Sequence, residues 1–203
     1  MKSARNNILN AAMELFARKG YAGCSIREIC LAAKITKPVL YYHFRGKEHL
    51  YQELMLDIFN QTRKNLLMIS EYRGSLRDRL VLYASSEFNN CRRDPNSVRL
   101  LFRMMFSPEG EYPRYNFVEE FQRERDAIAK IINDSKPKQR NSDGEIKAGA
   151  LMGMMLMQIL EYLFTGRRTL TRKTAERLVD LLVPNSSPVH FNIPIGKERR
   201  SRS

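Results

Sequence analysis

The sequence contains few cysteines and few histidines, which limits the chemistry that it can perform. Its 203 residues include three cysteines and three histidines. Cys24, Cys30 and Cys91 are odd in number and lack paired metal-ligand spacing, so we expect packing thiols in a reducing compartment. His43 and His49 lie six residues apart, and a helix would place them on opposite sides, which makes a poor metal site. We therefore predict no metal and no cofactor.

Long hydrophobic runs are also scarce. Polar residues interrupt the first twenty positions, which lack the unbroken apolar core of a signal peptide, so we expect a cytoplasmic protein. The most apolar run covers residues 148–160, and extending it to bilayer length brings in Lys147 and Glu161. This pattern favours a buried helix over a membrane span. Alternating strand patterns and internal repeats are missing too, which predicts an all-α protein.

Acidic residues are outnumbered by basic ones. The chain has 35 Lys and Arg against 22 Asp and Glu, a formal charge of +13 and a pI near 9.9. This excess predicts an acidic partner, for which DNA, RNA and an anionic membrane are the alternatives. The bias is strong in residues 1–50, which contain nine Lys and Arg and three Asp and Glu.

Three short helices are predicted in this basic segment. Apolar residues from Ile8 to Phe16 recur with helical spacing and Gly20 suits a helix end, which indicates a helix over residues 4–19. The stretch SIRE at 25–28 has the form of a capping box and predicts a second helix. Thr36 is expected to cap a third helix with Pro38 in its first turn. Short helices joined by a tight turn are typical of the helix-turn-helix motif.

The rest of the chain predicts a larger helical domain. A long helix is expected after Gly46, with no flexible linker before it, and the last residues have no helical pattern. Further helices are predicted at 75–92, 95–106 and 113–133 (the last two opened by Pro95 and Pro113), at 143–165 (capped by SDGE) and at 172–183. We predict a helix-turn-helix DNA-binding domain at 1–47, a larger helical domain at 48–183, and a basic, disordered tail at 184–203.

The third helix has one side suited to packing and other sides suited to contact. Leu40 and Phe44 point the same way and are expected to face inward, whereas Tyr41 is placed at the edge, where core and contact are both open. Pro38 and Val39 offer apolar surface to a thymine methyl, and Lys37 offers donors to guanine or phosphate. The remaining side chains on the outward sides are Thr36, Tyr42 and His43. Arg27 can reach a base or the backbone, while Ser25 and Lys47 lie at helix starts that suit phosphate.

The stretch from residue 8 to residue 50 resembles the DNA-binding segment of TetR-family transcriptional regulators. The resemblance is carried by AAMELFARKGY, SIREIC and LYYHFRGKEHL at fixed spacing. It implies that Thr36, Lys37, Pro38, Val39 and Tyr41 face bases, and that Tyr42, His43 and Lys47 contact phosphates. Ser25 and Arg27 match second-helix positions that touch base or phosphate in some members. Two residues depart from the usual pattern: Lys34 replaces a common turn glycine, and Gly46 replaces a frequent serine cap.

The resemblance also implies a homodimer and a small-molecule effector, and so makes 48–183 an effector-binding and dimerisation domain. The helices at 143–165 and 172–183 are expected to pair with their copies, since the first is apolar nearly all round; a helix central in a monomer is the alternative. A dimer would read two half-sites of a near-palindromic operator in double-stranded DNA. Plain core packing is an alternative for each of the residues that we expect to line the effector pocket, namely Phe102, Met105, Phe106, Phe117, Phe121, Met152, Met155, Gln158 and Tyr162.

These expectations favour a repressor that a ligand releases from its operator. A ligand-independent architectural or cell-division regulator on the same scaffold is the alternative. An enzyme is disfavoured because no cluster of nucleophile, base and orienting residue can be identified, so no catalytic residue is predicted. A protein that binds a membrane surface is the remaining explanation for the positive charge, and we do not expect a membrane partner.

Overall fold

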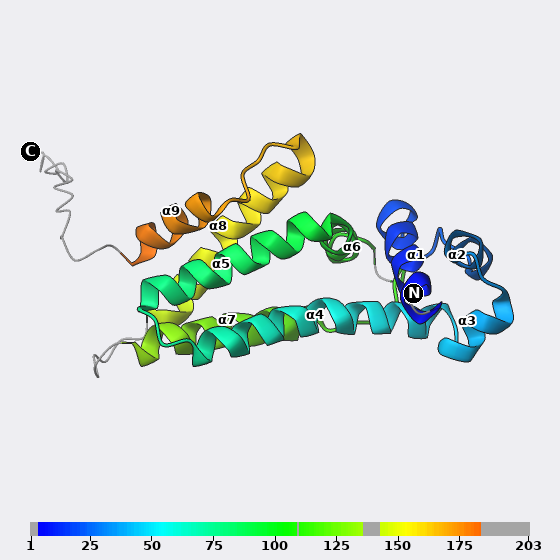
Figure 1. Ribbon diagram of the computed structural model, residues 1–203, viewed down its shortest axis with the longest axis horizontal. Helices are drawn as coiled ribbons and strands as arrows, with labels where there is room; N and C mark the ends of the chain where they lie inside the picture. Colours follow the sequence, from blue (N-terminus) through cyan, green and yellow to red (C-terminus); the bar gives the residue numbers. More distant parts are fainter. Residues whose placement is uncertain (1–3, 109, 136–142, 184–203) are drawn as a thin grey trace, which may run out of the picture.

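The computed structural model describes residues 4–108, 110–135 and 143–183, and these ranges contain helices and connecting segments without strands (Figure 1). The predicted all-α class is confirmed. The helices are α1 (Ala4–Lys19), α2 (Ile26–Ala33), α3 (Lys37–His43), α4 (Lys47–Glu71), α5 (Leu76–Arg93), α6 (Pro95–Met105), α7 (Phe117–Asp134), α8 (Gly144–Thr165) and α9 (Arg172–Leu182).

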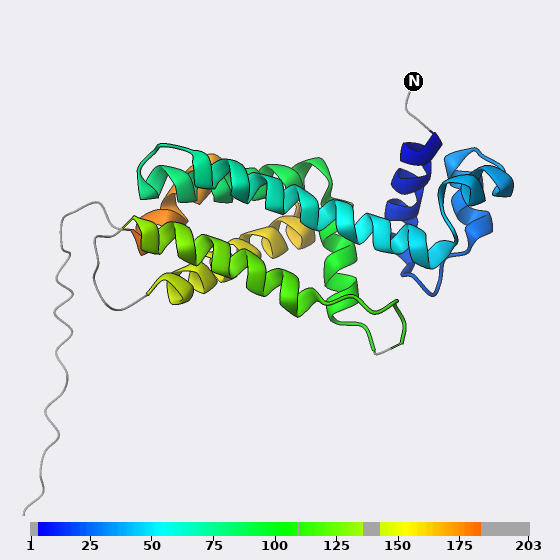
Figure 2. The same ribbon diagram turned by 90° about the horizontal axis from the view of Figure 1, so that it is seen from below.

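The helices form an elongated molecule with α1, α2 and α3 at one end (Figure 1). The long helix α4 begins among these three and runs along the body beside α7, as the second view shows (Figure 2). Helices α5, α8 and α9 complete the body, and α6 packs against α1. The small N-terminal group is therefore joined to the body by a continuous helix and by a direct contact.

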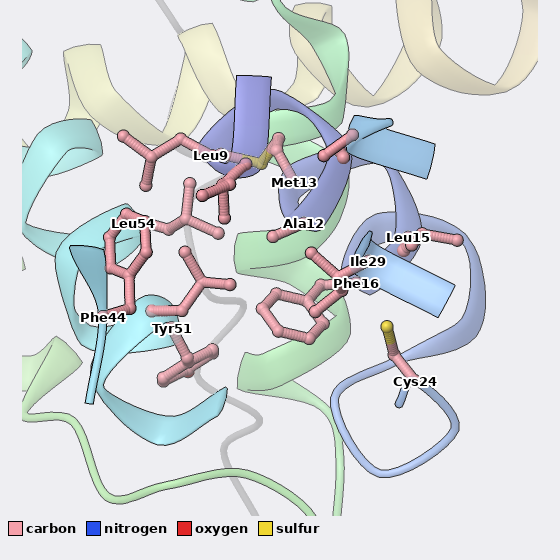
Figure 3. Close-up of a cluster of buried hydrophobic side chains, with 14 of the residues drawn as sticks. Leu9, Ala12, Met13, Leu15, Phe16, Cys24, Ile29, Phe44, Tyr51 and Leu54 are labelled. Atoms are coloured by element: carbon pink, nitrogen blue, oxygen red, sulfur yellow. The ribbon is translucent and has the colours of Figure 1, made fainter. Parts of the chain in front are cut away.

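Two buried clusters stabilise the two ends of the molecule. Figure 3 shows the first cluster, in which side chains of α1, Ile29 of α2 and Phe44 meet Tyr51 and Leu54 of α4. The second cluster joins α4, α5, α7, α8 and α9 around residues such as Phe88 and Ile132. Because α4 contributes to both clusters, a movement of the N-terminal helices is mechanically connected to the body.

Local signals explain where most helices begin. Ser25 and Ser75 form capping boxes with Glu28 and Asp78, so each serine and its acidic partner satisfy free amides at a helix start. Thr36 occupies the N-cap position of α3 with extended backbone, yet its hydroxyl makes no capping hydrogen bond. The predicted side-chain cap at Thr36 is therefore wrong. Pro38 in the first turn has no amide hydrogen, so α3 has one fewer free donor to cap.

One further helix start and one further cap differ from the predictions. Helix α7 begins at Phe117 and not near Pro113, because the Asn116 side chain accepts a hydrogen bond from the Glu119 amide at 3.1 Å and caps the helix there. Helix α8 follows Asp143 without a side-chain cap. Ser142 of the predicted cap and the predicted tail at 184–203 lie outside the described residues.

Candidate nucleic-acid interface

Helix α3 is held by two side chains that are almost completely buried. Leu40 is 0% exposed and Phe44, directly after the helix, is 1% exposed. They pack with Ile29 and Cys30 of α2 and with the inner face of α1. The Arg5 guanidinium lies over the Phe44 ring at 5.5 Å from its centroid, which adds a cation–π contact. These contacts fix which side of α3 faces outward.

The turn between α2 and α3 contains a non-glycine residue in the left-handed region. Lys34 has φ 55° and ψ 47°, and its amide donates to the Leu31 carbonyl at 3.2 Å. The Ile35 amide donates to the Cys30 carbonyl at 3.0 Å, which closes the end of α2. A side chain in this conformation costs about 1 kcal/mol relative to glycine. The expectation that this turn favours glycine geometry is confirmed, and the lysine keeps a positive charge beside α3.

The outward side of α3 is polar, aromatic and exposed. Thr36, Lys37 and Pro38 are exposed, and Val39 and His43 are partly buried. Tyr41 is 55% exposed and Tyr42 is 84% exposed, so neither ring belongs to the core. The Tyr42 and His43 rings meet edge to face with centroids 5.0 Å apart. A short helix with exposed lysine, proline and tyrosine side chains can enter a groove and offer donors and apolar surface.

The start of α2 forms a compact polar network. The Ser25 amide and hydroxyl both donate to the Glu28 carboxylate, at 2.8 and 2.9 Å. Lys19 binds the other oxygen of Glu28 at 2.5 Å, and hydrogen bonds from Lys19 and then Ser25 lower the pKa of Glu28 to about 2. The Ser25 hydroxyl therefore already has a partner within the protein. Arg27, by contrast, is exposed on the same helix.

Lys47 has partners that its position in the sequence did not suggest. Its ammonium donates to the carbonyl oxygens of Tyr21 and Cys24, both at 2.9 Å. It also lies 4.1 Å from the centroid of the Tyr21 ring. Lys47 thus connects the first turn of α4 to the segment between α1 and α2. Its predicted contact with phosphate would have to compete with these internal hydrogen bonds.

The same region matches a known protein family. Residues 8–54 match the model of "Bacterial regulatory proteins, tetR family", a range that covers α1, α2, α3 and the start of α4. Residues 8–54 are therefore similar to the N-terminal domain of TetR-family regulators. An HTH-type transcriptional regulator of Escherichia coli K12, UidR, is 42% identical over 52 residues, which are 26% of each chain. IcaR of Staphylococcus epidermidis, a negative transcriptional regulator of a biofilm operon, is 36% identical over 56 residues, or 28% of this chain and 30% of IcaR.

Beyond this domain the likeness to known proteins is one of fold. A transcriptional regulator from Aquifex aeolicus has a TM-score of 0.72 at 23% identity, with 89% of this chain and 98% of that chain covered. FadR of Bacillus halodurans, a fatty acid degradation regulator, has a TM-score of 0.71 at 12% identity over 92% and 97% of the two chains. The sequence matches to curated TetR-family relatives span about a quarter to a third of their length.

The nine residues predicted to line an effector pocket are spread over several helices of the molecule. Phe117 and Phe121 meet at the Phe59 ring, with centroids 6.1 and 6.3 Å away. Met152, Met155 and Tyr162 pack in the second cluster, whereas Met105 and Phe106 are exposed. Phe102 and Gln158 are partly buried. None of the nine lines either of two cavities of about 520 and 600 Å³ that reach the helical body.

These two cavities contain polar residues that sequence reasoning missed. The smaller one reaches Glu87 and the larger one reaches Glu124, and Thr62 lines both. Tyr83 donates to Glu124 at 2.6 Å. The available signal was the position of Glu87, four residues after the buried Tyr83 and four before the buried Cys91, on the inward side of α5. A carboxylate in that pattern indicates a buried polar site.

Proposed function

We propose that this protein is a sequence-specific DNA-binding transcriptional regulator that acts as a homodimeric repressor and is released from its operator by a small-molecule ligand. The observation that carries the proposal is the outward side of α3, where Lys37, Tyr41 and Tyr42 are exposed while Leu40 and Phe44 anchor the helix. The named functions of UidR and IcaR support regulation of transcription, and that of IcaR supports repression. None of the relatives named above is described as an enzyme, and we propose no catalytic activity.

The proposed roles follow the directions of the side chains. Thr36, Lys37, Pro38, Val39 and Tyr41 would meet base edges in the major groove, while Tyr42 and His43 would contact phosphates beside it. Arg27 would reach the backbone or a neighbouring base. For Ser25 and Lys47 the proposed phosphate contact requires sharing a group that already has an internal partner. A cytoplasmic location fits this function.

A homodimer through α8 and α9 is supported by the apolar side chains that these helices leave uncovered. Ile146, Met157 and Phe164 of α8 are 76%, 61% and 83% exposed, and Leu181 of α9 is 72% exposed. Gly149 and Gly153 have open space where a Cβ would lie, so another helix could approach closely there. A two-fold dimer would bury this apolar surface and place two copies of α3 on a near-palindromic site.

Helix α8 could also be interpreted as a membrane-spanning helix, which is the alternative to a dimer interface. Gly144–Thr165 is long and apolar enough to cross a membrane by length and composition, and 17% of its apolar window is buried within the chain. Its inner residues Ala148, Leu151 and Met155 pack in the second cluster, and α7 and α9 contact it. We therefore favour coverage of the other side by a second copy of the chain.

Release by a ligand requires a pocket in the helical body. The residues predicted for the effector pocket do not share one of the two cavities described above. A ligand-independent architectural regulator therefore remains the second candidate. Genome-wide binding separates the two, because a repressor with one operator gives a few strong sites, whereas an architectural protein gives many scattered sites.

The test of DNA recognition is a selection from random duplex DNA by the purified full-length protein at fixed salt. We expect enrichment of a near-palindromic sequence with two half-sites about one helical turn apart. A lack of enrichment over several rounds would refute sequence-specific binding. Liposomes of anionic lipid, tested at the same salt, provide the control for attraction by positive charge alone.

A further inference from the structure

A cleft of about 520 Å³ lies where the N-terminal helices meet the body. One side is made by α1, including Leu9, Asn10 and Met13, and the other sides by α4, α5 and α6, with Ile159 of α8 beyond. Figures 1 and 2 show these helices converging at the base of the N-terminal group. The volume falls within the range of about 300–1,000 Å³ that is usual for sites of small organic ligands.

The charged side chains of the cleft are mainly acidic, although the chain as a whole carries a formal charge of +13. Among the described residues that line it, Asp57, Glu87 and Asp94 are acidic and Arg93 is basic. None of the ion pairs formed by the described residues involves any of these three carboxylates. An acidic cleft in a basic protein attracts a cation and repels an anion.

Glu87 is the most buried of the three carboxylates, since Asp57 and Asp94 are exposed. Its two oxygens accept from neutral donors, the Asn65 amide at 3.0 Å and the Thr62 hydroxyl at 3.4 Å. Burial raises the pKa of Glu87, and burial together with the nearby charge of Glu87 raises the pKa of Glu124. A cation in the cleft would stabilise the ionised form of Glu87 and reduce the cost of placing two carboxylates together.

The rest of the lining suits a hydrocarbon group. Leu9 and Met13 of α1 face the same space as Ile58, Val98 and Leu101 of α4 and α6. A bare metal ion or a small inorganic cation would leave these side chains against water. We propose that the cleft binds an organic ammonium ion with an apolar body, with its ammonium group beside Glu87 and its hydrocarbon part between α1 and α6.

Such a ligand would couple the body to the proposed DNA-binding end. It would contact α1, which packs with α2 and α3, and at the same time α5 and α6, which belong to the body. A ligand that bridges these helices favours one angle between them and so changes the spacing of the two α3 helices in a dimer. This regulatory role rests on the proposed function, whereas binding of the ammonium ion does not.

The test uses 2-naphthylmethylamine and its neutral counterpart 2-naphthalenemethanol, titrated into the full-length protein at pH 7.5 and followed by naphthalene fluorescence. We expect the amine to bind with a sub-millimolar Kd and the alcohol to bind at least about tenfold more weakly, the loss of one charge-assisted contact. Glu87→Gln should weaken amine binding at least about tenfold and leave the alcohol unchanged. Glu119→Gln, an acid on the outer side of α7, is the matched control and should change neither Kd.

A circular dichroism melt establishes that each variant is folded. If Glu87→Gln does not fold, Asp57→Asn replaces a more exposed acid of the same cleft and should weaken the amine in the same direction. The inference is overturned if the amine does not bind at millimolar concentration, if amine and alcohol bind equally, or if the folded cleft variant binds the amine as the wild type does. Binding of ligand-free protein to selected DNA is measured separately, so failure there refutes the proposed function and not the cleft.

Discussion

Replacing Lys47 by alanine should lower the free energy of unfolding by about 2–4 kcal/mol. The ammonium makes two hydrogen bonds to carbonyls, at 2.9 Å each, and hydrogen bonds to a charged group contribute about 1.5–3 kcal/mol apiece. Its position 4.1 Å from the centroid of the Tyr21 ring adds about 0.5–1 kcal/mol. Lys47 is partly exposed, so water replaces some of these contacts in the variant, and the total is smaller than the sum.

Urea unfolding at a fixed protein concentration measures this loss, because the stability of a dimer depends on concentration. With a slope of about 2–3 kcal/mol per molar urea, the midpoint should fall by roughly 1 M. Lys37→Ala is the matched control, because Lys37 is exposed on α3, and its midpoint should stay at the wild-type value. An unchanged midpoint for Lys47→Ala would refute the claim that these contacts of Lys47 stabilise the fold.

Lys47→Ala also separates a stabilising role of Lys47 within the protein from a contact with phosphate. If Lys47 also neutralises a phosphate, Lys47→Ala should reduce the salt dependence of DNA binding by about one ion per subunit. If Lys47 only stabilises the segment before α2, Lys47→Ala should lower the free energy of unfolding and leave the salt dependence of DNA binding as in the wild type. The salt slope is measured by fluorescence anisotropy on one duplex at several ionic strengths.

Three further changes test the core, the buried acid and the dimer. Phe44→Ala should cost about 3–5 kcal/mol in urea unfolding, because the ring is 1% exposed beneath Arg5; a loss below about 1 kcal/mol would contradict its anchoring role. Burial raises the pKa of Glu124 to about 7, so between the unfolded pKa and pH 7 the folded protein holds a proton that the unfolded chain has lost. The free energy of unfolding of the wild type should therefore fall from pH 5 to pH 8 by about 1–3 kcal/mol more than that of Glu124→Gln. Equal pH profiles would refute this. Met157→Glu should shift sedimentation from dimer to monomer, and an unchanged dimer would move the interface away from α8.

Local sequence signals predicted most of the helices because they act over three or four residues. The capping boxes at Ser25 and Ser75 and the left-handed Gly20, with φ 79°, each mark a helix end without help from distant contacts. The start of α7 was mispredicted because the sequence offers two candidate starts. Pro113 suits a first helical turn, and Asn116 suits an N-cap. The side-chain oxygen of Asn116 accepts the hydrogen bond that caps α7, so the helix begins after Asn116 and not at Pro113.

Contacts between distant residues explain what the sequence could not predict at the site. The partners of Lys47 lie 26 and 23 residues earlier in the chain, so its internal role depends on how α4 meets the segment before α2. The orientation of Tyr41 was open from the helical wheel alone, and packing of Leu40 and Phe44 leaves it 55% exposed. The acidic cleft combines residues of five helices, so no single stretch of sequence reveals it.

The central claim is that the outward side of α3 reads DNA sequence, and the specificity ratio tests it most directly. This ratio compares the affinity for a selected duplex with that for a scrambled duplex at one salt concentration. The wild type should discriminate by about a thousandfold or more. The double variant Lys37→Ala/Val39→Ala should lose most of this discrimination while it unfolds at a similar urea concentration. A double variant that keeps the wild-type ratio would contradict the claim.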